Sequence, residues 1–181
     1  TTKRKNFITG GSLLGLSLSA LHVKGFTGLE KKEKGTMVNH KHPDNFELNE
    51  ITIGQLQQQM KDGKLSSHKL TQLYLKRIEE IDANGVELKA VLALNPDALT
   101  DAAKLDNERK SGKVRGPLHG IPVLVKDNIE TAGLATTAGS LALEGYKPKQ
   151  DAFVVRQLRA AGAVILGKTN LSEWANIRSE K

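Results

Sequence analysis

Two short apolar segments, each ending on a lysine, constrain this fold most. "IPVLVK" covers residues 121–126 and "AVILGK" covers residues 163–168. Both are aliphatic runs bounded by glycine or polar residues, which is typical of strands buried inside a sheet rather than of strands with one wet face. Between them lies a segment with apolar residues at helical spacing, which Asp151 can cap. This order predicts a sheet covered by helices.

The rest of the chain continues the alternation of helices and short strands. Two earlier helices are indicated by residues that favour helix ends: Thr52 and Ser66 as N-caps, Gly63 and Gly85 as stops. Residues 88–94 predict a short strand, and Pro96 opens a polar third helix. Residues 170–176 predict the start of a further helix. We therefore expect an α/β fold in which helices surround a largely parallel or mixed β-sheet.

Composition indicates a globular chain with an aliphatic core. Hydrophobic residues make up 38% of the 181 residues and charged residues 26%, but aromatic residues only 4%. The absence of cysteine excludes disulfides, cysteine-ligated metal centres and a cysteine nucleophile. The formal net charge is +7, yet residues 1–41 hold eight Lys/Arg against two acids. Because the rest of the chain is nearly balanced, we expect no nucleic-acid partner for it.

Three regions are expected along the chain. Residues 1–25 predict an export signal-like segment, with a basic start followed by a moderately apolar stretch that is too short and polar for a stable membrane span. This start resembles a twin-arginine signal in which Arg4-Lys5 replaces the two arginines. It favours a bacterial protein exported to the periplasm or outside the cell, with a cytoplasmic location as the alternative. Residues 26–45 predict a polar linker, and residues 46–181 the ordered domain.

A phosphate-binding motif is matched by residues 162–169 but rejected on physical grounds. The segment fits G-x-x-x-x-G-K-[ST], whose loop wraps backbone N–H groups around phosphate. Here the four residues after Gly162 are themselves the predicted strand, and a strand directs its N–H groups sideways into a ladder. We therefore expect no nucleotide site.

The histidines are also interpreted as structural. His40 and His42 lie in the predicted linker, where a solvated segment is favoured over a metal site. His119 lies in a Gly/Pro-rich loop, where bonding to local backbone is favoured over catalysis. The sequence thus indicates no metal and no cofactor.

Lys126 is the strongest candidate for chemistry. It ends an apolar strand, and functional groups gather at the carboxyl ends of strands in α/β sheets. In apolar surroundings a lysine loses its hydration, which disfavours the ammonium and makes a neutral amine available as a general base or a Schiff-base former. The alternative is an amine that pairs with a neighbouring acid such as Asp127. The pattern alone does not decide between them.

At this point the sequence carries a family resemblance. "GPLHGIPVLVKDNIETAGLATTAGS" and "DAFVVRQLRAAGAVILGKTNLSEWA" resemble the N-terminal part of the amidase signature family, and the likeness covers residues 46–181. The resemblance implies an α/β domain that hydrolyses or transfers amide C–N bonds through a Ser–cis-Ser–Lys triad. It places the triad lysine, which exchanges protons with the nucleophile through the cis-serine, on Lys126.

One departure from the family pattern limits what this chain can do. The family's two serines and oxyanion-binding backbone lie in a Gly/Ser-rich stretch, and no such run occurs in a matching place here. A lysine base without these groups has nothing to activate. We therefore expect the N-terminal part of an amidase, inactive alone, whose substrate is a small carboxamide. The alternatives are an amidotransferase subunit that amidates misacylated tRNA and a non-catalytic α/β binding module. The sequence does not indicate an oligomeric state.

Overall fold

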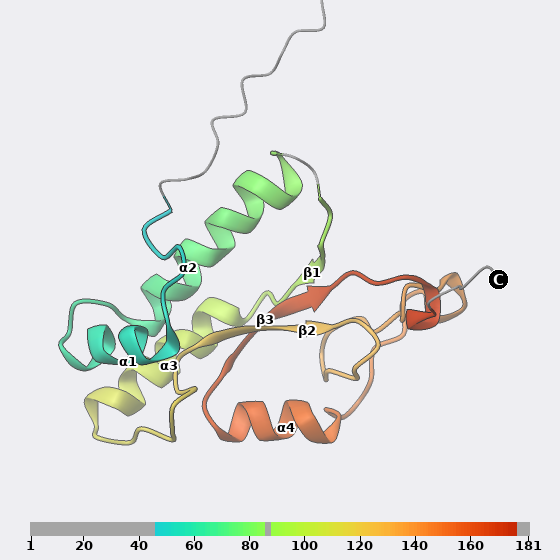
Figure 1. Ribbon diagram of the computed structural model, residues 1–181. Helices are drawn as coiled ribbons and strands as arrows, with labels where there is room; N and C mark the ends of the chain where they lie inside the picture. The colour runs from blue at the N-terminus through green and yellow to red at the C-terminus, as the bar shows by residue number, and fades with distance from the viewer. Residues whose placement is uncertain (1–45, 86–87, 177–181) are drawn as a thin grey trace, which may run out of the picture. The chain divides into compact units, whose positions relative to one another are not determined.

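The computed structural model describes residues 46–85 and 88–176 (Figure 1). The predicted signal-like segment and linker, residues 1–25 and 26–45, lie outside this part. The elements are α1 (Ile53–Lys61), α2 (Ser67–Arg77), the π-helical turn η1 (Ile78–Ala83), β1 (Val91–Leu94), α3 (Ala98–Lys110), β2 (Pro122–Lys126), the 3-10 turn η2 (Leu141–Leu143), α4 (Phe153–Ala160), β3 (Val164–Thr169) and the 3-10 turn η3 (Glu173–Ala175).

The described strands form one mixed sheet in the order β1-β3-β2. β2 runs parallel to β3, whereas β1 runs antiparallel to it. Both apolar segments that end on lysine are therefore strands, with β3 at the centre, and the expected mixed sheet with surrounding helices is confirmed.

Alternate residues of the sheet pack against different helices, so its two faces have separate cores. Val164 and Leu166 of β3 pack with Leu105 of α3. Ile165 packs with Val155 of α4. Since successive side chains of a strand point to opposite faces, α3 and α4 cover opposite sides of the sheet. In Figure 1, α4 lies below the sheet.

A β-bulge interrupts the pairing of β2 with β3. Val123 is opposite Ile165, but Leu124 is opposite Gly167, so Leu166 is an extra residue on β3. Asn95 stabilises this bulge: its backbone N–H donates to the Leu166 carbonyl at 2.9 Å, and its side-chain amide donates to the Ile165 carbonyl at 2.7 Å. The bulge changes which face the later residues of β3 occupy.

The predicted caps of the first two helices are confirmed. Thr52 caps α1 in a capping box with Gln55, and Gly63 follows the helix with a φ of 72°. Ser66 caps α2 by accepting from the backbone of Lys69. The carboxylate of Asp106 on α3 also accepts from two first-turn N–H groups of α2, at 2.7 and 2.9 Å, which joins these two helices.

Two local predictions were wrong. Asp151 does not cap α4, because its carboxylate instead accepts from the backbone of Ala132 and from the Arg159 guanidinium. Residues 170–176 do not begin a regular helix, because Trp174 has a φ of 54° and donates its N–H to the Ala138 carbonyl at 2.7 Å. In both cases a backbone group of a loop, at Ala132 or Ala138, binds a group that the expected helix would have used.

Within the described ranges, no helix combines the length and the apolarity needed to cross a bilayer.

Candidate active site

Lys126 is the last residue of β2, at the edge of the sheet where the parallel strands β2 and β3 both end. Its side chain is exposed. Among the described residues, its amine has no hydrogen-bond or ion-pair partner. Apolar surroundings, which were one of the two interpretations of the pattern, are therefore not formed around this lysine by the described residues. Its catalytic role stays a prediction.

Asp127 does not pair with Lys126. It follows Lys126 on the opposite side of the strand, where it is buried, with a side chain that is 1% exposed. One of its carboxylate oxygens, Oδ2, accepts from the backbone N–H of Thr137 at 2.9 Å and from the Thr137 hydroxyl at 2.6 Å. The other, Oδ1, lies 3.4 Å from the Lys168 ammonium. The alternative interpretation, an ion pair between adjacent residues, is thus wrong, because their side chains point to opposite faces.

Lys168 is the buried lysine of this sheet edge. Its side chain is 0% exposed. Besides the ion pair with Asp127, its Nζ donates to the Ile129 carbonyl at 2.7 Å and to the Thr136 hydroxyl at 2.9 Å. Burial lowers the pKa of Lys168, and the negative charge of Asp127 opposes that shift. Three oxygen partners explain how a lysine is accommodated inside an apolar layer.

The bulge in β3 places Lys168 here. In a regular strand, Lys168 would share a face with Val164 and Leu166 and would point toward α3. The extra residue shifts the register, so Lys168 is paired with Val125 and lies on the same face as that residue and Asp127. Sequence reasoning missed this pair, although the lysine at the end of an apolar run in β3 was a signal that could have found it.

The conformation of β3 also shows why residues 162–169 do not form a phosphate-binding loop. Residues 164–169 are extended in β3, and the motif lysine, Lys168, is committed to Asp127 and two neutral oxygens. The sequence-based exclusion of a phosphate loop in this segment is therefore confirmed.

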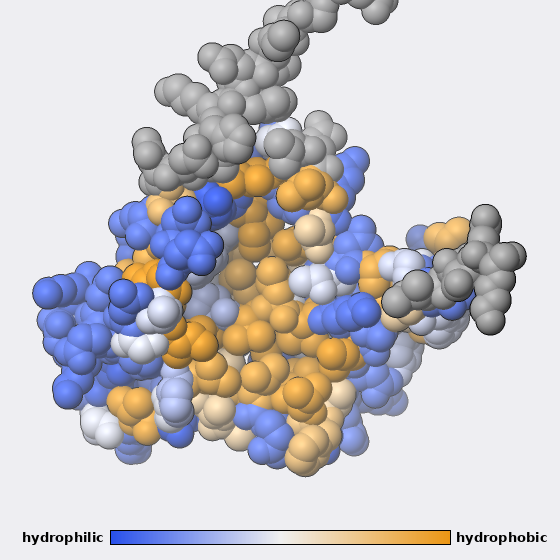
Figure 2. All heavy atoms as spheres, viewed as in Figure 1, coloured by the Kyte–Doolittle hydropathy of each residue, from blue (hydrophilic) through white to orange (hydrophobic). Residues whose placement is uncertain are grey.

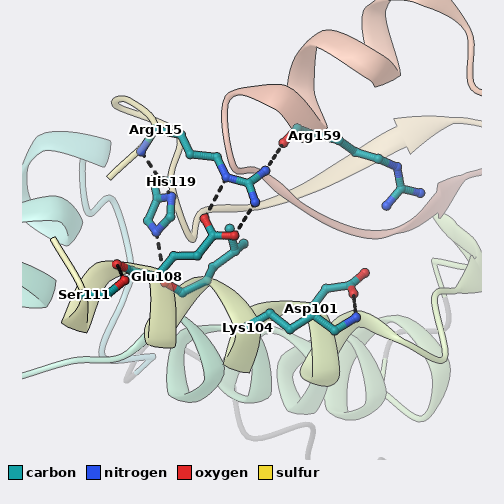
Figure 3. A network of polar contacts seen from close by, with 8 residues as sticks. Asp101, Lys104, Glu108, Ser111, Arg115, His119 and Arg159 are labelled. Atoms are coloured by element: carbon teal, nitrogen blue, oxygen red, sulfur yellow. Dashed lines mark hydrogen bonds and ion pairs between the residues drawn. The ribbon is translucent and has the colours of Figure 1, made fainter. Parts of the chain in front are cut away.

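His119 binds backbone groups, as predicted. It is fully buried, its Nε2 lies 3.0 Å from the Leu105 carbonyl, and its Nδ1 accepts from the backbone N–H of Arg115 at 3.4 Å. Figure 3 shows the Arg115 guanidinium bound to Glu108 of α3 and to the carbonyl of Arg159 in α4. The hydrogen bonds from Arg115 lower the pKa of the Glu108 carboxyl. The network joins α3 to α4 through the loop that precedes β2.

Comparison with known proteins defines the family. A family model described as Amidase matches residues 69–181. The chain is 50% identical over 138 residues to a putative amidase of Schizosaccharomyces pombe, covering 75% of this chain and 23% of that protein. It is 41% identical over 130 residues to a subunit of the glutamyl-tRNA(Gln) amidotransferase of Salinispora arenicola, covering 71% of this chain and 26% of that protein.

Solved structures agree with this match. The crystal structure of the native peptide amidase of Stenotrophomonas maltophilia is similar with a TM-score of 0.71 and 59% identity, over 72% of this chain and 27% of that one. An amidase family protein of Bacillus anthracis follows with a TM-score of 0.68 and 47% identity, over 71% and 25%. The fold is thus that of the amidase signature enzymes, and the chain belongs to the amidase family.

The matched part is a small share of each relative. The chain spans about a quarter of the length of the relatives it matches. These relatives come from fungi, bacteria and, for a probable amidase of Arabidopsis thaliana, a plant. They therefore do not assign the bacterial origin that the N-terminal segment suggested.

Proposed function

We propose that this chain is the N-terminal part of an enzyme that hydrolyses a carboxamide C–N bond, with Lys126 as the base of a Ser–cis-Ser–Lys triad. The observation that carries the proposal is the position of Lys126. It stands at the carboxyl end of a parallel strand, with an exposed amine that has no partner among the described residues. An unpaired lysine at such an edge is free to meet groups from the rest of a catalytic domain.

The proposed chemistry needs two serines that this chain does not supply. The neutral amine of Lys126 takes a proton from the cis-serine, which takes one from the nucleophilic serine as that oxygen attacks the amide carbon. The tetrahedral intermediate then collapses, the C–N bond breaks, and the proton returns to the leaving amine. Water repeats the sequence on the acyl-enzyme and releases the carboxylic acid.

Desolvation of Lys126 is part of this proposal. In this chain the side chain is exposed. A hydrated lysine amine holds its proton tightly, and removing its water makes it a better base. The residues that cover Lys126 therefore belong to the remainder of the amidase domain, together with the Gly/Ser-rich stretch that brings the two serines.

A substitution in the full-length protein tests the proposal. The first substrate to try is a peptide amide, because the chain is 59% identical to a peptide amidase over the matched part. Lys126→Ala should lower kcat at least about 100-fold, the low end for a general base. The matched control is Lys104→Ala, which removes an exposed lysine of α3 whose partner, Asp101, lies 3.0 Å away. If Lys126→Ala keeps the kcat of Lys104→Ala, the assigned role is wrong.

A second candidate is a role within an amidotransferase. The 41% identity to the glutamyl-tRNA(Gln) amidotransferase component of Salinispora arenicola supports it, whereas the predicted export segment argues against a substrate found in the cytosol. Glutamine-dependent amidation of misacylated glutamyl-tRNA by the full-length protein, with its partner subunits, would favour this candidate. A non-catalytic binding module is favoured if the rest of the protein has no Gly/Ser-rich stretch with two serines.

Export of the protein is a separate proposal. It rests on the basic and apolar pattern of residues 1–25. Fusing these residues to a reporter that works only outside the cytoplasm tests it. Replacing Arg4 and Lys5 by glutamine should abolish export if the route resembles the twin-arginine pathway.

A further inference from the structure

We infer that the buried pair Asp127 and Lys168 is a positioning device for Lys126. Neither residue would touch the substrate; the pair would hold the end of β2 so that the Lys126 amine stays aligned with its reaction partners. The inference rests on the proposed function of Lys126, because only a catalytic lysine needs such alignment.

Two neighbouring residues project from opposite sides of one strand at this site. Lys126 and Asp127 are adjacent and project to opposite faces: the lysine is exposed, and the carboxylate is buried. The buried Asp127 side chain therefore anchors one side of the strand, and the Lys126 side chain extends from the other side. A shift or rotation of the Asp127 peptide changes the direction of the Lys126 side chain, since the two residues share a peptide plane.

Backbone hydrogen bonds hold the peptide between Lys126 and Asp127 in place. The Asp127 N–H donates to the Thr169 carbonyl at 3.1 Å, which joins the ends of β2 and β3. The Lys126 carbonyl accepts from Ile129 at 3.0 Å, and the Asp127 carbonyl accepts from Ala138 at 3.2 Å. These backbone hydrogen bonds therefore connect Lys126 and Asp127 either to the loop after β2 or to the end of β3.

The ion pair connects the loop contacts of Asp127 with those of Lys168. Asp127 binds the loop through Thr137, and Lys168 binds it through Thr136 and the Ile129 carbonyl. The 3.4 Å contact between Lys168 Nζ and Asp127 Oδ1 connects these two sets of loop contacts. Without the ammonium, a buried carboxylate would lack its counter-charge and would move toward water, carrying the end of β2 with it.

The balance of hydrogen bonds supports a role beyond stability. Asp127 Oδ2 accepts two short hydrogen bonds, but Oδ1 accepts none with good geometry from the described residues and has only the ion pair. Buried ion pairs add little net stability compared with apolar residues of similar volume. A buried pair of this kind, placed directly beside an exposed lysine, is better explained by the orientation that it imposes.

The experiment compares four variants of the full-length protein in steady-state hydrolysis of a peptide amide, with thermal unfolding measured in parallel. They are Lys168→Met, Asp127→Asn, the double variant of both, and Thr137→Val, which removes a hydroxyl but leaves the ion pair. Lys104→Met is the matched control for loss of a lysine elsewhere. Lys126→Ala is included to report on the proposed function itself.

We expect Lys168→Met and Asp127→Asn to lower kcat about 10- to 100-fold with KM within about twofold, as misplacement of a catalytic group does. Thr137→Val should lower kcat about threefold or more, and it remains informative if the charge variants fail to fold. The double variant should regain melting temperature, because no unpaired charge is buried, while its kcat stays low. That separation of stability from kcat distinguishes positioning from a merely structural role.

Two results would overturn the inference. One is a wild-type kcat in soluble Lys168→Met or Thr137→Val; the other is recovery of kcat together with melting temperature in the double variant. If Lys126→Ala itself keeps wild-type kcat, the proposed function fails instead, and the positioning role fails with it. A low kcat in Lys126→Ala beside normal kcat in the other variants rejects the positioning role alone.

Discussion

Gly162 packs directly against the ring of His119. A Cβ atom on Gly162 would lie 2.7 Å from His119 Nδ1, and the φ of Gly162 is +82°. The Gly162 carbonyl also accepts from the N–H of Gly120 at 2.7 Å. The turn between α4 and β3 is therefore fitted against the loop that enters β2, so the two parallel strands begin from one shared junction.

This contact predicts a strong packing effect at Gly162. Gly162→Ala should lower the free energy of unfolding by about 1 kcal/mol for the left-handed backbone and by a further 1–3 kcal/mol or so for overpacking. Gly112→Ala is the matched control, because Gly112 has a φ of +79° and a Cβ atom on it would meet nothing within 4 Å. Urea unfolding of both variants measures the difference in their free energies of unfolding. Equal losses in the two variants would show that the His119 ring moves aside without destabilising the fold.

Gly167 is expected to be the least replaceable residue of β3. A Cβ atom there would lie 2.3 Å from the carbonyl oxygen of Ala93 in β1. Since that oxygen belongs to the backbone of a paired strand, it cannot move without loss of pairing. Gly167→Ala should therefore separate β1 from β3, measured as faster amide hydrogen exchange in residues 91–94. Unchanged protection of β1 would contradict this expectation.

The buried Lys168 predicts a dependence of stability on alkaline pH. Burial lowers the pKa of Lys168 below its ordinary value of 10.5 in the folded state. Between the lowered pKa and 10.5, the unfolded chain binds more protons at this site than the folded chain does, so the stability that this site contributes rises with pH in that window. Relative to Lys168→Met, the unfolding free energy of the wild-type protein should therefore increase as pH approaches 10.5. A decrease would mean that Asp127 outweighs desolvation.

The 181-residue chain alone should show no amide hydrolysis above the blank, because it lacks a Gly/Ser-rich stretch to supply the nucleophile and oxyanion donors. Measurable turnover by the purified chain would refute this reasoning.

The same chain should also associate or melt at low temperature. β1 is an edge strand of the described sheet, with Leu92 46% and Leu94 44% exposed, and Figure 2 shows hydrophobic residues gathered in a broad band across the viewed face. Light scattering and thermal unfolding, compared with the full-length protein, measure this.

Sequence patterns predicted the elements whose signals are local. The apolar runs at 121–126 and 163–168 became β2 and β3 with boundaries moved by one residue. Thr52 and Ser66 capped their helices, because a hydroxyl beside a free N–H has no better partner nearby. These outcomes depend on a few adjacent residues, which a sequence displays directly.

Patterns failed where a distant partner competed. The Asp151 carboxylate accepts from Arg159 and from the backbone of Ala132 instead of capping α4. The Trp174 N–H donates to the Ala138 carbonyl instead of joining a helix. The pattern left open whether Lys126 is buried, and its side chain is exposed in the described part of the chain. The ion pair of Asp127 with Lys168 joins two segments far apart in the sequence and depends on the bulge, which simple alternation does not reveal.

The bulge at Leu166 makes the pairing of β3 as restrictive as its composition. A strand with one extra residue behaves as two half-strands of opposite phase. Pairing of the same residues without the bulge would leave the apolar content of the segment unchanged, yet it would turn Lys168 toward α3 and leave the buried Asp127 carboxylate without its counter-charge. The phase of β3 therefore decides which side of the sheet receives the charge of Lys168.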